Sequence, residues 1–199
     1  GLKLSVDKCQ ICFSKVKYLG HIVSAKGVAP DPEKIDAITQ WPMPTNLKTL
    51  QSFVGFCGYY RRFIANYSAI VRPLTELTKG YAPTQKARWD QSCTDAFQQI
   101  IHCLSHAPVL AFANPQKPYI LHVDASLKGL GAVLYQESAE GLRPVAFASR
   151  KLSTSERNYP VHQLEFLSLK WAVVDKFHEY LYGARFTVRT DNNPLTYVL

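Results

Sequence analysis

The spacing of apolar and polar residues divides the chain into a short β-rich start, a helical middle and a mixed second half. Residues 2–28 read as short strands and turns, with apolar runs at 10–13 and 16–23 separated by Ser14 and Lys15. A hairpin of this kind is marginal alone and normally joins a larger sheet. We therefore expect the first residues to be the cut edge of a larger structure.

The period changes to that of helices after residue 30. Asp31 is predicted to cap a helix in which Pro32 is the first residue, because a short acidic side chain followed by proline is typical of helix starts. Asn46 is predicted to open a second helix, and Gly55 and Gly58 are predicted to bend the chain after it.

Two more helices are expected before the pattern changes again. Apolar positions predict them at 68–79 and 89–106, with a linker at 80–86 between them. Residues 30–106 are therefore expected to form a mostly helical, basic unit.

The second half alternates short apolar strands with one long helix. Strands are predicted at 119–123, 129–136, 143–149 and 186–190, and the helix at 161–182, ended by Gly183. Asn193 and the two residues after it look like a further helix start. Three hairpin-linked strands, a helix and another strand predict a mixed α/β fold.

Composition and charge narrow the function classes. Apolar residues make up 47% and aromatic residues 12% of the 199-residue chain, which indicates a folded protein. No apolar run approaches the roughly 18–20 residues that span a bilayer, and the first residues lack a signal peptide's apolar stretch. We expect no membrane partner and a cytosolic or nuclear protein, or a piece of a longer polyprotein.

The net charge of +8 is concentrated in the first half. Residues 1–106 carry 13 Lys and Arg against 7 Asp and Glu, whereas residues 107–199 carry 10 against 8. A basic half favours a polyanion, of which nucleic acid is the usual one. An ordinary basic surface would have the same charge.

The five cysteines lack the regular spacing of a disulfide framework. Cys9 and Cys12 form one CxxC, but no second pair follows and the flanks read as β-structure, which disfavours zinc. Cys57, Cys93 and Cys103 fall in helical patterns and are expected to be core residues.

Three acids stand out by position. Asp124 ends an apolar strand, Glu165 lies in an apolar stretch of the long helix, and Asp191 ends the fourth strand. Converging carboxylates repel each other unless cations lie between them, and clustered oxygens are what Mg²⁺ selects. Two such ions could activate water against a phosphodiester. Each acid alone also has a structural explanation, as a turn former, a cap or a solvated helix residue.

Several ordered motifs in the second half resemble ribonuclease H domains of Ty3/gypsy-type retrotransposons. They are, in chain order, Asp124-Ala125-Ser126 with Gly129-Leu130-Gly131-Ala132-Val133-Leu134, the segment 144–153, the segment 156–159 and the segment 190–197. Asn192 and Asn193 depart from the His and Lys common in that family. The resemblance implies that Asp124, Glu165 and Asp191 are three of four metal-binding acids, holding Mg²⁺ (Mn²⁺ as an alternative) in a two-metal site.

The first half resembles the preceding part of the same polyproteins. Tyr18-Leu19-Gly20-His21 is similar to the primer grip, and segments 31–35, 50–55 and 58–64 are similar to the reverse transcriptase thumb. The resemblance implies that Tyr18, Leu19 and Gly20 contact the template–primer duplex. Basic, aromatic-rich helices suit phosphate contacts that read no sequence, and we expect Arg61 or Arg62 near nucleic acid.

The resemblance also implies how the chain divides into domains, and which partners and location to expect. Residues 1–29 would be the palm edge and primer-grip hairpin, 30–106 the thumb and connecting helix, and 107–199 an incomplete ribonuclease H domain. No Asp-Asp pair of a polymerase centre is present, and the fourth nuclease acid would lie beyond Leu199. The expected partners are an RNA–DNA hybrid, the template–primer duplex and the fingers and palm of a reverse transcriptase. The cytoplasm or retroelement particles would be the location, with the nucleus as an alternative.

Three functions remain open at this stage. The first is metal-dependent cleavage of RNA in hybrids, for which Ser126 and Asn192, each beside a candidate acid, would read 2′-hydroxyls. The second is a non-catalytic connection module of the same fold. The third is a domesticated remnant that binds nucleic acid or a protein without cutting. Oligomeric state is not indicated by the sequence.

Overall fold

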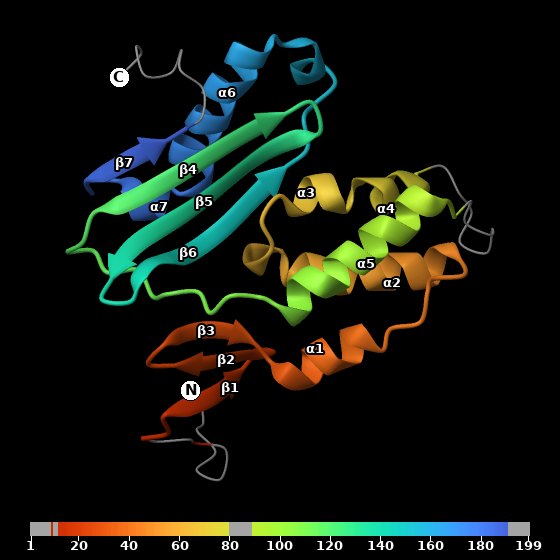
Figure 1. The fold of residues 1–199 in the computed structure, drawn as a ribbon, viewed down its shortest axis with the longest axis horizontal. Helices are drawn as coiled ribbons and strands as arrows, with labels where there is room; N and C mark the ends of the chain where they lie inside the picture. The colour runs from red at the N-terminus through yellow and green to blue at the C-terminus, as the bar shows by residue number, and fades with distance from the viewer. Residues whose placement is uncertain (1–8, 10–11, 80–88, 191–199) are drawn as a thin grey trace, which may run out of the picture.

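A computed structural model describes residues 9, 12–79 and 89–190, which form two sheets and a group of helices (Figure 1). Strands β1 (Lys15–Tyr18), β2 (His21–Ser24) and β3 (Gly27–Pro30) make an antiparallel sheet in the order β1-β2-β3. The predicted strand 16–23 is wrong as one unit, because Leu19 (φ 47°) and Gly20 (φ 75°) take left-handed conformations that turn the chain. Lys15, expected in a turn, begins β1.

The helical half contains α1 (Pro32–Thr39), α2 (Leu47–Tyr59), the 3-10 turn η2 (Arg61–Phe63), α3 (Tyr67–Ile70), α4 (Arg72–Leu77) and α5 (Gln91–Ser105). Both predicted caps are confirmed. The Asp31 carboxylate accepts from the amide of Glu33 at 3.2 Å, and Asn46 forms a reciprocal capping box with Thr49.

Two predictions in this half are wrong. Gly55 and Gly58 do not bend the chain but lie inside α2, because the buried face of Leu50, Phe53 and Cys57 holds the helix together through them. The predicted helix 68–79 is two short helices, separated at Val71. The predicted linker 80–86 lies outside the described residues.

The second half is a four-stranded sheet in the order β6-β5-β4-β7, with β7 parallel to β4 and the other neighbours antiparallel. Its elements are β4 (Tyr119–Ser126), β5 (Gly129–Ser138), β6 (Gly141–Arg150), η3 (Glu156–Asn158), α6 (Val161–Lys170), η4 (Trp171–Lys176), α7 (His178–Leu181) and β7 (Phe186–Arg189). The mixed α/β prediction is confirmed. The single long helix is not, because η4 is a π-helical segment followed by a break at Phe177. The helix expected after Asn193 lies outside the described residues.

The sheet is covered on both faces. Leu121 and Val123 share a buried cluster with Leu164 and Leu169 of α6, whereas Phe147 packs on the core of the helical half. Figure 1 accordingly shows α6 and α7 on one side of the sheet and α2 to α5 beside β6. Because side chains alternate along a strand, the residues next to Leu121 and Val123 face the side of the helical half.

Backbone contacts join the three parts. Val28 and Leu110 exchange two hydrogen bonds of 2.8 Å, and the amide of Ala111 donates to the carbonyl of Pro144 at 2.8 Å. The Arg143 guanidinium donates to the carbonyl of Lys26. The N-terminal sheet is thus tied both to the end of the helical half and to β6. No helix in the described part of the chain is long and apolar enough to cross a membrane.

Candidate active site

Asp124 lies two residues before the end of β4, opposite Gly131 of β5. Its exposed carboxylate borders a hollow of about 350 Å³ on the face of the sheet that the helical half adjoins. The hollow is lined by Ala65, Asn66, His122, Val123, Asp124, Gly131, Ala132, Val133, Arg189 and Thr190. Residues from both halves of the chain therefore meet around this carboxylate.

Asn66 of the helical half contacts Asp124 directly. Its side-chain amide donates to Oδ2 of Asp124 at 3.2 Å, and its own backbone is left-handed, with φ 52°. The contact depends on glycine at 131, because a Cβ there would stand 2.0 Å from Oδ1 of Asn66. Next to it, the amide of Ser68 donates to the hydroxyl of Ser149 at 2.9 Å. The start of α3 thus docks on β5 and β6, and from there Asn66 reaches the acid on β4.

Glu165 is buried on α6, which covers the other face of the sheet. One turn later on the same helix, the buried hydroxyl of Ser168 lies 3.2 Å from the carbonyls of both Asp124 and Gly131. The helix that carries Glu165 is therefore tied to the backbone of β4 at Asp124 itself. Glu165 does not line the hollow.

The third predicted acid, Asp191, and its neighbour Asn192 lie outside the described residues. Arg189 and Thr190, just before them, line the hollow, and Arg189 pairs with His122 across the parallel β4–β7 ladder. Within the described ranges no group of three or more His, Cys, Asp or Glu side chains could hold a metal ion.

His122 adds a titratable group to the hollow. Burial lowers the pKa of its imidazole, and the nearby positive charge of Arg189 lowers it further. The ring also contacts Tyr135, with centroids 4.9 Å apart. At neutral pH the imidazole is therefore mostly uncharged, and Arg189 supplies the positive charge of the lining.

The donor set around Asp124 suits Mg²⁺. This ion keeps several of its waters and binds proteins through one or two carboxylates. An exposed carboxylate beside about 350 Å³ of space meets that requirement, since a water occupies roughly 30 Å³. Asp124 is the described residue best placed to hold such an ion.

Ser126, expected to read the RNA strand, is the last residue of β4, where the chain turns toward β5. Its hydroxyl accepts from the amide of Lys128 at 3.2 Å and donates weakly to the carbonyl of Gly129 at 3.4 Å. The side chain is exposed but serves the turn and does not line the hollow.

The predicted grip residues Tyr18, Leu19 and Gly20 form an exposed turn held by the end of α2. The hydroxyl of Tyr59 donates to the carbonyl of Leu19, and that of Tyr60 donates to the carbonyl of Gly20 at 2.9 Å. With the backbone fixed in this way, the side chains of Tyr18 and Leu19 point to solvent, 63% and 69% exposed.

The two predicted arginines lie in η2, directly after Tyr60, the residue that holds the carbonyl of Gly20. Arg61 and Arg62 are exposed, and the Arg62 guanidinium stands 5.9 Å from the ring centre of Phe63. Tyr60 and Phe63 are core residues, whereas Tyr59 is half-exposed. The segment therefore combines buried aromatic side chains with exposed cationic ones.

Sequence reasoning missed four residues around Asp124: Asn66, His122, Ser168 and Arg189. Asn66 is separated from Asp124 by 58 positions, and nothing in a helical pattern signals such a contact. His122 could have been predicted to lie beside Asp124, because side chains two residues apart on a strand share a face. The same reasoning applies to Arg189, two residues before Asp191.

Comparison with protein families identifies the second half. The family described as the RNase H-like domain found in reverse transcriptase matches residues 89–188, about half of the chain.

Curated relatives match the chain from end to end. It is 37% identical over 208 residues to the Retrovirus-related Pol polyprotein from transposon opus of Drosophila melanogaster, covering 100% of this chain and 21% of the relative. The polyprotein from transposon gypsy of the same organism is 36% identical, with 100% and 20% covered. The Transposon Tf2-3 polyprotein of Schizosaccharomyces pombe is 36% identical over 85% of this chain and 12% of the relative. The chain thus spans about a fifth or less of these relatives.

Solved structures share the fold. A foamy viral protease-reverse transcriptase in complex with RNA/DNA hybrid matches with a TM-score of 0.80 and 24% identity, covering 94% of this chain and 25% of that one. The same kind of protein in complex with dsDNA matches with a TM-score of 0.78, over 94% and 38%. Both matches include the helical half as well as the sheet.

Proposed function

Because the chain belongs to the family of RNase H-like domains found in reverse transcriptases, we propose that it cleaves the RNA strand of RNA–DNA hybrids by metal-dependent hydrolysis. The observation that carries the proposal is the exposed Asp124 carboxylate at the hollow, next to the Arg189 side chain. The helical half would grip the template–primer duplex beside the fingers and palm of a retroelement reverse transcriptase. The RNA/DNA hybrid bound by the structurally similar foamy viral protein supports this choice of substrate.

Each side chain has a proposed role. Asp124, Glu165 and Asp191 would hold Mg²⁺ or Mn²⁺, the last from outside the described residues. When bound in pairs, these ions supply an activated water and stabilise the leaving oxygen of the phosphodiester. Asn66 holds the Asp124 carboxylate in place through its 3.2 Å hydrogen bond. Arg189 would attract the scissile phosphate, and Ser126 and Asn192 would read the 2′-hydroxyl.

A cleavage assay with a matched pair of variants tests the proposal. Labelled hybrid is incubated with Mg²⁺ or Mn²⁺ and the chain, both as it stands and extended at its C-terminus. Asp124→Asn keeps the size of the side chain but removes its charge, so cleavage should fall by about 100-fold or more if the carboxylate holds the ion. Asp175→Asn, the same change at an exposed position of η4, should leave cleavage unchanged.

Either of two results would contradict the nuclease proposal. If the extended protein binds hybrid tightly and never cuts it, or if Asp124→Asn cuts as well as the wild type, the nuclease proposal is wrong.

The non-catalytic connection-like module remains the second candidate. One observation favours it: the side-chain amide of Asn66 already occupies one oxygen of Asp124. The first outcome above, tight binding without cleavage, is the result that this candidate requires.

A further inference from the structure

Basic side chains gather where the helical half meets the end of β6. Arg72 begins α4 and Lys79 follows its end, Lys151 comes directly after β6, and Arg157 lies in η3. We call these four residues the α4 seam. They come from two parts of the chain that are far apart in sequence, so neither helical amphipathicity nor a local charge run explains their meeting.

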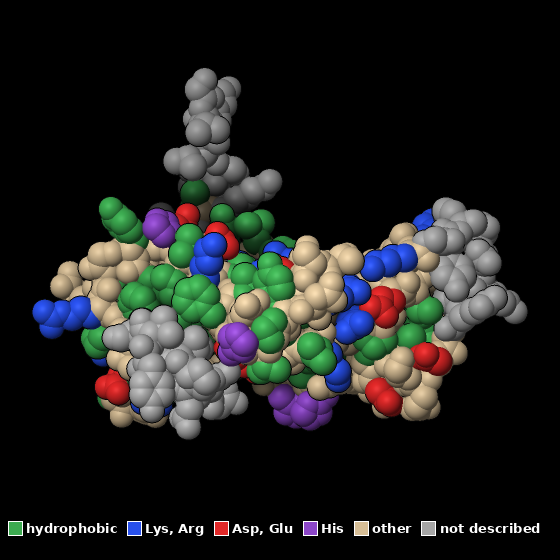
Figure 2. All heavy atoms as spheres, turned by 90° about the horizontal axis from the view of Figure 1, so that it is seen from above, with side chains coloured by type: hydrophobic (Ala, Val, Ile, Leu, Met, Phe, Trp, Pro, Cys, Tyr) green, Lys and Arg blue, Asp and Glu red, His purple; other side chains and the backbone are tan. Residues whose placement is uncertain are grey.

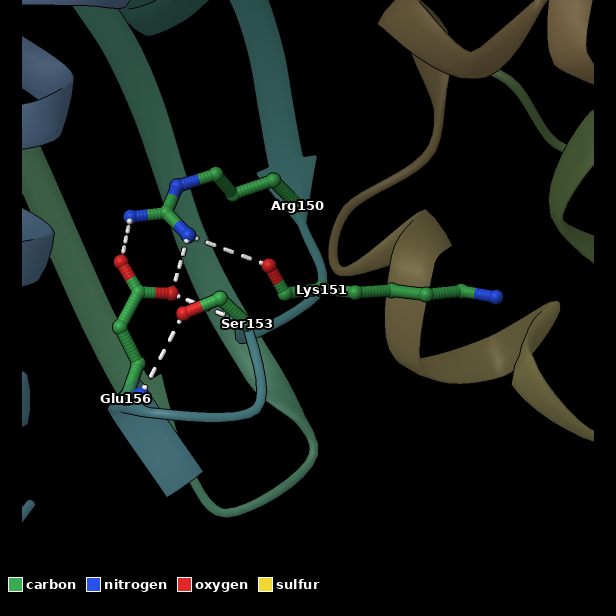
Figure 3. A network of polar contacts seen from close by, with 4 residues as sticks. All are labelled: Arg150, Lys151, Ser153 and Glu156. Carbon is green, nitrogen blue, oxygen red and sulfur yellow. Dashed lines mark hydrogen bonds and ion pairs between the residues drawn. The ribbon is translucent and has the colours of Figure 1, made fainter. Parts of the chain in front are cut away.

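Lys151 is the residue that joins the two parts. In Figure 3 its side chain leaves the strand end in the direction opposite to Arg150 and extends toward the helical half. Its ammonium group donates to the hydroxyl of Thr75 in α4. Partial burial lowers the pKa of this ammonium group, and the positive charges of Lys79, Arg72 and Arg157 add to the effect, offset in part by Glu76.

The positive charges of the seam outnumber the acidic side chains that pair with them. Glu76 pairs with Arg72 at 2.8 Å, and Glu156 pairs with Arg150, which lies next to the seam. Among the residues that the structure describes, Lys79, Lys151 and Arg157 form no ion pair. Figure 2, which looks down on this side of the molecule, shows a group of Lys and Arg side chains with acidic ones among them, right of the centre.

The seam continues the hollow beside Asp124. Asn66 lines the hollow and directly precedes α3, and Arg72 follows six residues later at the start of α4. At about 1.5 Å of rise per helical residue, Arg72 and Lys79, at the two ends of α4, lie roughly 10 Å apart. The cations therefore extend away from the hollow over a length that a single small anion would not fill.

We propose that the α4 seam binds the sugar–phosphate backbone of a nucleic acid duplex whose other contacts lie at the Asp124 hollow. The inference rests on the proposed function in its choice of partner, a hybrid duplex. A duplex carries a phosphate for each 1.7 Å of its axis, so several phosphates would face a row of cations spread along a helix and a strand end. No base is read at such a surface, so binding there is independent of sequence.

The test measures binding of a labelled RNA–DNA hybrid to the 199-residue chain by fluorescence anisotropy at several KCl concentrations. The double variant Lys79→Gln with Arg157→Gln removes two exposed charges of the seam. The control, Lys34→Gln with Lys176→Gln, removes two exposed charges from α1 and η4. Circular dichroism verifies that both variants fold.

The seam variant should bind hybrid about 10-fold more weakly, and the slope of log affinity against log salt should fall by about 2, one for each lost phosphate contact. The control should keep the wild-type slope. Wild-type affinity and slope in the seam variant, or no hybrid binding by the wild type, would overturn the proposal. A seam variant that loses only its affinity for a poly-glutamate peptide would also overturn it, in favour of an acidic protein partner.

The outcomes separate the seam from the proposed nuclease. If the seam variant loses affinity while no version of the protein cuts hybrid, the seam stands and the nuclease proposal fails. If the wild type cuts and the seam variant binds normally, the reverse holds.

Discussion

Arg150 and Glu156 form a bidentate ion pair at the end of β6 (Figure 3). Two guanidinium nitrogens of Arg150 donate to the two carboxylate oxygens of Glu156 at 2.7 and 2.9 Å, and the amide of Ser153 donates to the same carboxylate at 2.7 Å. The side chain of Glu156 is 17% exposed. These bonds, those from Arg150 first, lower the pKa of Glu156 from 4.5 to about 2. They fix the loop from which Lys151 reaches α4.

This pKa predicts how stability depends on pH. Because the folded protein holds Glu156 charged, the contribution is complete above the ordinary pKa of 4.5 and is lost as the pH falls toward 2. Glu156→Gln should lower the free energy of unfolding by about 1.5–3 kcal/mol near neutral pH. The difference between the two proteins in urea titrations should shrink from about pH 6 to about pH 3.

The control for this prediction is Glu179→Gln, at an exposed position of α7. It should change the stability by no more than about 0.5 kcal/mol at either pH. A pH-independent cost of Glu156→Gln would show that packing, and not charge, explains the loss.

At the scale of elements, the docking of α3 on the sheet depends on two glycines of β5. A Cβ at Gly131 would stand 2.0 Å from Oδ1 of Asn66, and one at Gly129 would stand 3.1 Å from the hydroxyl of Ser68 in α3. The strand therefore uses glycine where another element approaches closely. The sequence motif that contains these glycines thus records a contact between the two halves.

Gly131→Ala should displace Asn66 and cost about 1–3 kcal/mol of stability, as overpacking does. Asn66→Gly removes the obstructing side chain and suits the left-handed backbone at 66. In that background Gly131→Ala should cost at least about 1 kcal/mol less, a coupling that a double-mutant cycle of urea titrations measures.

Gly55→Ala provides the matched control, since nothing lies within 4 Å of a Cβ there. In the interior of α2 this change should stabilise the protein by about 0.5–1 kcal/mol. If the Asn66→Gly background leaves the cost of Gly131→Ala unchanged, the two residues do not interact as described.

Helix starts and turns could be predicted from the sequence where the interactions that stabilise them are between residues close together in the chain. The caps at Asp31 and Asn46 were found because they act on amides two and three residues away. The turn at Leu19–Gly20 was missed because tyrosines 40 residues distant hold its carbonyls. The site divides in the same way: Asp124 was evident at a strand end, whereas Asn66 reaches it only through tertiary docking.

At the scale of the whole molecule, contacts at several places tie the helical half to the sheets. Among them are the Val28–Leu110 pairing and the contacts Asn66–Asp124, Ser68–Ser149, Phe147 with the helical core, and Lys151–Thr75. With contacts at both ends of the interface, opening one half would expose the buried surface of the other.

The two halves should therefore unfold in one transition. The tryptophans report on them separately, since Trp41 packs in the helical half on Phe53 and Trp171 lies in the sheet half under Arg150. Variants that keep only Trp41 or only Trp171, the others being phenylalanine, should each show one urea midpoint shared by fluorescence and far-ultraviolet circular dichroism. A Trp41 signal that melts apart from the circular dichroism would show independent halves.

The pairing of Val28 with Leu110 has a topological consequence. Gly27, at φ 125°, permits it, because a Cβ at this position would stand 2.0 Å from the carbonyl oxygen of Leu110. The two ends of the segment 31–109 consequently lie close together, because they flank the paired residues Val28 and Leu110. Closing a loop costs little more as the loop grows, roughly 0.6 kcal/mol for each doubling of its length. The loops within this segment can therefore be shortened or enlarged, during evolution or in the laboratory, while β3 and the approach to β4 keep their places.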